Sequence, residues 1–175
     1  AAMERISVAL VVGYFSWGAY NEVRLERADA AVASASGPAA IVDGVEFANA
    51  AEVVVFQFEA TRDRWFPWAG LVGMPVCYLI LSATAACYGG IVREFYDSLF
   101  AGAAHHRRYL LGLVLGPLLY GASSFAPFLL IESDKLPTPR LITLLSISAL
   151  CGCFVEKTWQ FLEALLEKFF KRVKE

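Results

Sequence analysis

The residues of this chain whose types could support chemistry are few, and the cysteines come first. Cys151 and Cys153 have the close spacing of half a metal site, since paired thiolates are common zinc ligands. No second pair with suitable spacing stands in a polar setting, and Cys77 and Cys87 also fall in apolar blocks. Thiols in such surroundings behave as small hydrophobic side chains. We therefore expect no metal, no cofactor and no disulfide.

The histidines and acids give little more. His105 and His106 are adjacent, so they cannot project from one helix face as ligands at i and i+4 would. The sequence contains no HExxH, Walker A, GxSxG or GxGxxG motif. Glu156 closes the last apolar run; an acid within a membrane indicates an ion path, whereas one at a helix exit is usually solvated. Glu156 is thus a candidate ion-path residue, and we do not expect an enzyme.

Composition indicates what positions these residues. Hydrophobic residues make up 58% of the 175, charged residues 18%, and the mean hydropathy is +0.53. Ordinary soluble domains have roughly 45–50% apolar and about 25% charged residues. The excess is concentrated in blocks, which predicts a multi-pass protein of the lipid bilayer. A net charge of −2 argues against a nucleic-acid partner.

Four apolar stretches predict four transmembrane helices. The clearest runs from Tyr109 to Ile131, a stretch without a charge that at about 1.5 Å per residue crosses a core of about 30 Å. The first, Ile6 to Tyr20, is short for a span, so we expect it tilted; a signal peptide is the alternative. The predicted all-α membrane protein has spans at 4–21, 66–100 (with a cytoplasmic extension), 107–131 and 140–175 (continuing as an amphipathic helix).

The helix over 66–100 is expected to start near Pro67, a residue suited to a first turn, and to kink at Pro75. Beyond Gly90 an apolar line at i+4 spacing predicts that the helix continues. The polar side chains of this extension should then turn outward. The apolar line is Ile91, Phe95 and Leu99; the polar side chains are Arg93, Glu94 and Asp97.

The polar segment 22–65 is expected outside the cytoplasm. Helix formers in 21–36 indicate that the first helix continues until Gly37-Pro38. Asp43-Gly44 between β-branched residues is a strong hairpin signal, because both central residues of a type I′ turn need φ > 0. Residues 52–59 can extend that sheet, but a helical 4-3-4-3 spacing over 47–61 leaves a helix as the alternative.

Small residues recur every four positions in three of the predicted helices. Such stripes let helices approach closely in lipid, where no hydrophobic drive holds them together. We expect tight helix–helix packing at Ser82, Ala86, Gly90, Gly112, Gly116, Ala122, Ala126, Ser148 and Gly152. The loop Leu136-Pro-Thr-Pro139 makes a rigid return between the last two spans.

The C-terminal stretch predicts an interaction helix. Its apolar residues recur at 3-4-3-4 spacing, the seam of a coiled coil, and are Trp159, Leu162, Leu166, Phe169 and Val173. Three further apolar residues, Phe161, Leu165 and Phe170, make this face wider than a two-stranded seam requires. Its partner could be copies of this chain, the membrane surface or a cytoplasmic protein. No breaker is apparent after Val155, so one long helix leaving the membrane is expected and a surface-lying helix is disfavoured.

Basic residues set the predicted orientation. With both termini in the cytoplasm, nine Lys and Arg fall inside and six outside, where they are mixed with acids. This excess follows the positive-inside rule. We expect a bacterial inner-membrane protein with both termini cytoplasmic.

Residues 89–170 carry a resemblance. In order they are Gly89-Gly90-xx-Arg93, Arg108-Tyr-Leu-Leu, Gly116-Pro117, a short proline loop, and Gly152-x-Phe154-x-Glu156-Lys157 before an amphipathic tail. This resembles the C-terminal half of a broad set of small bacterial multi-pass membrane proteins, most without an assigned function. That set often has serine where Val155 stands. Proteins of this architecture also occur in bacterial anti-phage operons as sensors or pore-forming effectors.

Three functions follow as expectations. The first is a homo-oligomeric inner-membrane sensor or effector, of an anti-phage defence system by the analogy above, coupling the external segment to the cytoplasmic tail. A small pore or ion channel is the alternative, for which Ser and Thr side chains would line the path. The third is a membrane scaffold that anchors a cytoplasmic partner through the C-terminal helix.

Overall fold

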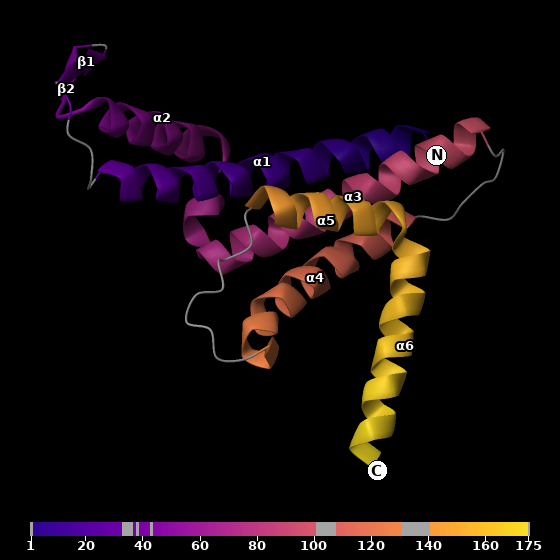
Figure 1. Ribbon diagram of the computed structural model, residues 1–175. Helices are drawn as coiled ribbons and strands as arrows, with labels where there is room; N and C mark the ends of the chain where they lie inside the picture. Colours follow the sequence, from indigo (N-terminus) through magenta and orange to yellow (C-terminus); the bar gives the residue numbers. More distant parts are fainter. Residues whose placement is uncertain are drawn as a thin grey trace. The chain divides into compact units, whose positions relative to one another are not determined.

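The computed structural model describes residues 2–32, 37, 39–42, 44–100, 108–130 and 141–174, without the side chains of 2, 40, 100, 123–130, 165, 166 and 168–174. Within these residues the chain is mostly helical with a small two-stranded sheet (Figure 1). Its elements are α1 (Ala2–Val32), β1 (Ala40–Val42), β2 (Val45–Phe47), α2 (Ala50–Trp65), the short 3-10 helix η1 (Ala69–Leu71), α3 (Met74–Phe100), α4 (Arg108–Leu130), α5 (Leu141–Cys153) and α6 (Val155–Lys174). The predicted proline loop at 136–139 and both histidines lie outside the described residues.

The prediction of four membrane spans is met only in part. Among the described residues one helix, α3 over Met74–Leu99, is long and apolar enough to cross a membrane, and α5 with α6 makes a second only if that bent pair counts as one span. The predicted first span is the N-terminal part of α1, whose uncharged run covers only about 22 Å. Helix α4 has 23 residues, and the part of it whose side chains are described, Arg108–Ala122, is apolar.

The chain forms two compact units, and α1 and α3 contribute residues to both. Unit 1 comprises Ala1–Val12 and Ser82–Glu175, and unit 2 comprises Gly13–Leu81. Unit 2 thus holds the hairpin, α2 and η1, and unit 1 holds α4, α5, α6 and most of α3.

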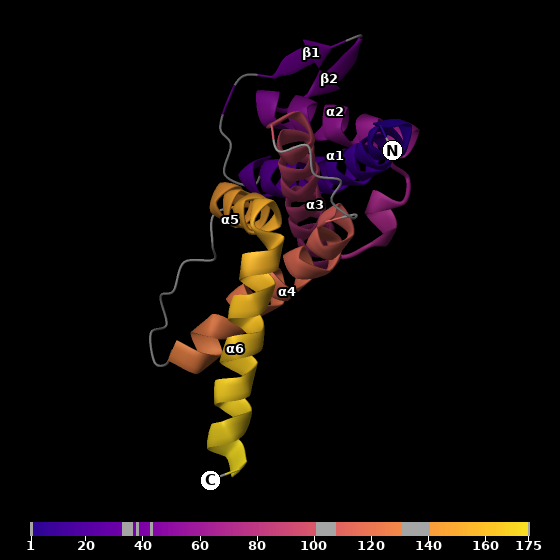
Figure 2. The ribbon, with the colours of Figure 1, turned by 90° about the vertical axis from the view of Figure 1, so that its right-hand side faces the viewer.

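In unit 2 the predicted hairpin is confirmed. Strands β1 and β2 pair antiparallel with Val42 opposite Val45, and Gly44 takes a φ of 81°, the left-handed conformation that the turn requires. Asp43 lies outside the described residues. The hairpin lies beside the start of α2 (Figure 2), where the Phe47 and Phe56 rings are 5.4 Å apart.

Residues 50–65 are a helix rather than a continuation of the sheet. The side chain of Asn49 accepts hydrogen bonds from the backbone N–H groups of Ala51 and Glu52, at 2.9 and 3.1 Å. The Glu52 carboxylate in turn accepts from the backbone N–H of Ala48 at 2.8 Å. This resembles a capping box, in which the first free donors of a helix are satisfied, except that the Glu52 carboxylate bonds the residue before the N-cap and not the N-cap itself. The Asn-x-x-Glu spacing therefore decides between the two alternatives.

The two prolines of the predicted second span have other roles. Pro67 lies in the connection after α2, not in the first turn of a long helix. Pro75 is the second residue of α3, where its missing N–H costs nothing, so it begins the helix instead of kinking it. Aromatic rings pack in this region. The ring centroid of Trp68 lies 5.2 Å from that of Phe15 and 6.4 Å from that of Tyr14, and the Tyr14 ring also contacts the Phe66 ring.

The C-terminal region departs most from expectation. Instead of one long helix, α5 ends at Cys153 and α6 begins at Val155, with a turn at Phe154 and a bend of 97° between them. Figure 1 shows this corner, with α6 leading away from α5. The Thr158 hydroxyl donates to the backbone carbonyl of Phe154 at 3.1 Å and helps to satisfy the backbone there. The prediction of a straight exit near Glu156 is therefore wrong.

Candidate functional site

The candidate site is a cluster of ionised side chains buried in unit 1, around the end of α3. Glu94 is 2% exposed and Asp97 is also buried, whereas Phe95 and Leu99 on the opposite face are 60% and 62% exposed. The expectation that Glu94 and Asp97 turn outward is therefore wrong, and the helix presents them inward. A buried carboxylate is expensive unless it is paired and hydrogen-bonded.

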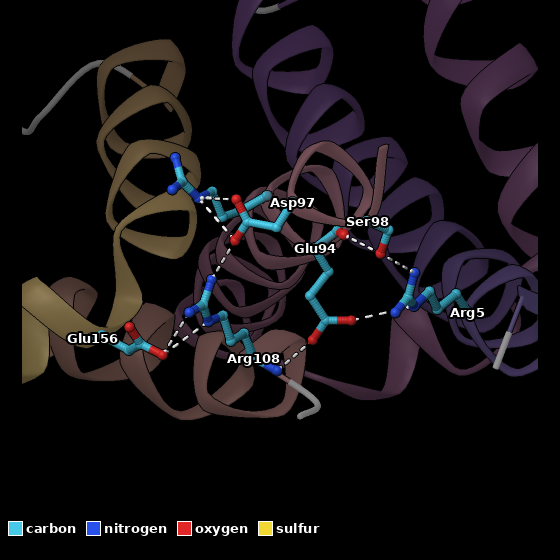
Figure 3. Close-up of polar contacts among 7 residues, drawn as sticks. Arg5, Glu94, Asp97, Ser98, Arg108 and Glu156 are labelled. Carbon is cyan, nitrogen blue, oxygen red and sulfur yellow. Dashed lines mark hydrogen bonds and ion pairs between the residues drawn. The ribbon is translucent and has the colours of Figure 1, made fainter. Parts of the chain in front are cut away.

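Glu94 meets both requirements by joining three helices (Figure 3). Its carboxylate accepts from the backbone N–H of Arg108, the first residue of α4, and so caps that helix from α3. The other carboxylate oxygen lies 3.3 Å from Nε of Arg5 in α1. Arg5 also donates to the Ser98 hydroxyl at 3.2 Å, and that hydroxyl donates to the Glu94 backbone carbonyl at 2.7 Å.

Asp97 forms the second half of the cluster. One Asp97 carboxylate oxygen lies 2.6 Å from the Arg108 guanidinium. The other lies 3.2 Å from Nε of Arg93, one turn earlier on α3. The Arg108 guanidinium also binds the Glu156 carboxylate with two nitrogens, at 2.8 and 2.9 Å. Arg108 is itself mostly buried, so it bridges a buried acid on α3 to an exposed acid on α6.

These contacts connect α1 to α6 through Arg5, Glu94, Arg108 and Glu156. Arg5 pairs with Glu94, the Glu94 carboxylate accepts from the backbone N–H of Arg108, and the Arg108 guanidinium pairs with Glu156. We call these four residues, with Arg93, Asp97 and Ser98, the charge network. It holds three guanidinium groups and three carboxylates, so its charges balance. Removal of one partner from a buried ion pair is strongly destabilising, because it leaves an uncompensated buried charge.

Tyrosines and a small apolar cluster border the charge network within unit 1. The Tyr109 hydroxyl donates to the Glu4 carboxylate at 3.0 Å, and the Tyr88 hydroxyl donates to the Ala9 carbonyl at 2.8 Å. The buried cluster beside them is Val12, Cys87 and Tyr109. The start of α1 is thereby held against α3 and α4 by polar as well as apolar contacts.

The predicted packing stripes come together within one chain. A Cβ on Gly112 would lie 2.6 Å from the Ala86 carbonyl oxygen, and one on Gly152 would overlap the same oxygen. Likewise Gly116 packs on the Ser82 backbone and Gly90 on the Tyr109 backbone. Ser148 is buried in α5, whereas Ala122 is exposed and the side chain of Ala126 lies outside the described residues. These glycines thus serve contacts among α3, α4 and α5 of the same molecule.

Only part of the predicted tail surface can be followed. Trp159 and Phe161 are exposed and Leu162 is half-buried, while the side chains of Leu166, Phe169 and Val173 lie outside the described ones. Glu156, the candidate ion-path residue, is mostly exposed and ion-paired with Arg108. The structure therefore places Glu156 at the edge of the charge network.

Unit 1 exposes many large apolar side chains, beside the exposed charges of α6. Large hydrophobic side chains are exposed on each of its helices, and Ile142 reaches 78%. They are Met3, Ile6, Leu10, Val11, Val92, Phe95, Tyr96, Leu99, Leu110, Leu111, Val114, Leu118, Ile142, Ile147, Leu150, Phe154, Trp159 and Phe161. Large exposed apolar patches mark sites where a protein meets a membrane, a ligand or another protein.

One signal in the sequence could have located the charge network. The small stripe Ser82, Ala86, Gly90 extends at the same i+4 spacing to Glu94, and Asp97 lies on that face. The prediction instead took the apolar line of Ile91, Phe95 and Leu99 as the buried face of α3, and that assignment is wrong for Phe95 and Leu99. The pairing of Arg5 with Glu94, 89 positions apart, has no local signal.

Unit 2 contains a separate cavity of about 300 Å³, lined by acids and one guanidinium. Burial raises the pKa of Glu22 there, and Asp63, Glu26 and Glu59 raise it further, while Arg62 at 4.0 Å opposes the shift. In the described part of the chain no three His, Cys, Asp or Glu side chains are grouped as a metal site requires. This acidic cavity therefore has no feature that specifies a ligand.

No family model, curated protein or solved structure matches this chain.

Proposed function

We propose that this protein is a membrane-embedded sensor or effector, in which the charge network is a latch that couples α1 to α6. One observation carries the proposal: unit 1 buries Glu94 and Asp97 in ion pairs beneath a surface of large apolar side chains. Ionisable groups within a membrane module are costly, so their presence indicates a function.

The pairing favours a latch over a conduction path. An ion or proton path needs titratable groups along a wet route, whereas Glu94, Asp97 and Glu156 each contact a guanidinium. Ion pairs that join several helices can exist in two arrangements, and rearrangement of such contacts is a recurrent switching device. A displacement of α1 that separates Arg5 from Glu94 would also disturb the cap of α4 and the hold of Arg108 on Glu156.

Hydrogen exchange of the full chain in lipid nanodiscs tests the latch. Glu94→Gln removes the charge that pairs with Arg5, and we expect faster amide exchange both in the first turn of α4 and around Val155–Thr158 of α6. Glu26→Gln, an exposed acid in unit 2, is the matched control and should leave both regions unchanged. If only the first turn of α4 exchanges faster, Glu94 is a helix cap and the proposed coupling is wrong.

A pore remains the alternative function. Liposomes that contain the reconstituted chain should show no ion flux above that of empty liposomes if the network is a latch. Flux that is abolished by Glu156→Gln would favour the ion path.

A further inference from the structure

We propose that α6 lies flat in the polar interface of an anionic membrane leaflet, with its apolar side in the lipid. This rests on the proposed membrane location of unit 1. The bend at Phe154 carries the inference, because it removes the reason for expecting α6 to project into water.

The geometry of the corner sets the direction of α6. Helix α5 has 13 residues, about 20 Å long, and is entirely uncharged. A helix that leaves it at 97° runs nearly parallel to the membrane plane when α5 runs along the membrane normal. Exposed apolar side chains continue along the chain through this corner, from Leu150 to Phe154 and Phe161.

The sequence of α6 suits an interfacial helix better than a coiled coil. At 100° per residue its large apolar residues cover about half of the circumference. A coiled-coil seam is narrower, whereas interfacial helices combine a wide apolar face with a strongly charged one. Trp159 fits such a position: its indole N–H donates to Glu163 at 2.7 Å on the same helix, so the ring can enter the interface with its polar atom satisfied.

Charge indicates which membrane surface is bound. Residues 165–175 carry Lys168, Lys171, Arg172 and Lys174 against two acids. At the other end of α6 a cavity of about 80 Å³ is lined by Arg93, Arg108 and Lys157 with Glu156 as its acid. The C-terminal end of α6 is therefore cationic in balance, which suits the phosphates of anionic lipids. At the start of α6 the guanidinium groups of Arg93 and Arg108 are already paired with Asp97 and Glu156, so Lys157 is the cation that this end adds.

Fluorescence quenching by brominated lipids tests this placement in the full chain. The fluorescence of Trp159 is obtained as the tryptophan emission of the wild-type chain minus that of Trp159→Phe. Each is reconstituted in vesicles of phosphatidylglycerol brominated near the carbonyl end of the acyl chain. We expect this difference to fall about twofold or more relative to unbrominated vesicles, since an interfacial indole lies at that depth. Quenching should be weaker in the corresponding phosphatidylcholine vesicles.

Two double variants with the same added charge and spacing supply the controls. Leu162→Asp with Leu166→Asp places the acids on the apolar side and should abolish the quenching. Gln160→Asp with Ala164→Asp places them on the polar side, where both residues are exposed, and should leave most of it. If Trp159 of the wild-type chain is not quenched, the proposal is overturned. A lower particle mass of the Leu162→Asp, Leu166→Asp variant would then indicate that α6 is a self-associating helix.

The membrane location is measured separately in the same vesicles. Protein that stays with them after alkaline extraction while Trp159 is unquenched contradicts only the placement of α6. Protein that alkali releases contradicts the proposed function itself.

Discussion

The two units of this chain bury different polar groups. Unit 2 buries apolar side chains such as Val23 and Leu25 together with two neutral amides: Asn21, which donates to the Phe58 carbonyl at 3.1 Å, and the cap residue Asn49. Unit 1 instead buries the carboxylates of Glu94 and Asp97, while both units expose large apolar side chains, such as Ile142 in unit 1 and Leu71 in unit 2. The difference lies in the guanidinium groups that α1, α3 and α4 bring to these carboxylates, because a carboxylate is buried at acceptable cost only when it is paired and hydrogen-bonded.

The largest effect is expected from breaking the buried pairs of unit 1. Arg108→Leu removes the guanidinium that pairs with Asp97 and with Glu156, so we expect the free energy of unfolding to fall by about 3–5 kcal/mol. Arg93→Leu removes a more exposed partner one turn away on α3 and should cost less than about 1 kcal/mol. Unfolding by denaturing detergent, followed by circular dichroism, measures both. Equal losses for the two variants would show that the network has no buried centre.

A smaller effect is expected from the helix contacts of unit 1. Gly116→Ala drives a methyl group into the Ser82 backbone of α3 and should destabilise by about 1–3 kcal/mol. Gly121→Ala on the same helix meets nothing within 4 Å, so it should be neutral or stabilise by up to about 1 kcal/mol. The same detergent titration compares them. If Gly116→Ala changes the particle mass and not the unfolding midpoint, this glycine packs between molecules.

The smallest effect is expected in unit 2 and depends on pH. The pKa of Glu22 is raised in the fold, chiefly by burial, so its protonated form is favoured there. Stability from this group is full below its unfolded pKa and is lost as the pH rises through the folded value. Glu22→Gln should therefore raise the melting temperature at pH 7 and not at pH 4, with Glu46→Gln, an exposed acid of β2, as the control. A gain of the same size at both pH values would refute the role of titration.

The sequence predicted the parts of the fold that depend on local signals. The hairpin turn at Gly44, the continuation of α1 and the continuation of α3 past Gly90 follow from turn chemistry and periodicity. No proline stands at the bend at Phe154, and the nearest glycine, Gly152, still belongs to α5, so the sequence gives only a weak local signal for the break. The core face of α3 was misjudged because its partners, Arg5 and Arg108, lie on other helices.

The most direct test of the account is carbene labelling from within the membrane. A lipophilic diazirine photolysed in vesicles that contain the full chain should modify the exposed apolar positions of unit 1, such as Leu10, Ile142 and Leu150, and mass spectrometry locates the adducts. Strong labelling is expected at these positions, and little at Ser148 and Gly152, which are buried positions of α5, the helix that also holds Ile142 and Leu150. If Ile142 and Leu150 instead escape the lipid reagent and react with water-borne hydroxyl radicals, unit 1 does not lie in the membrane.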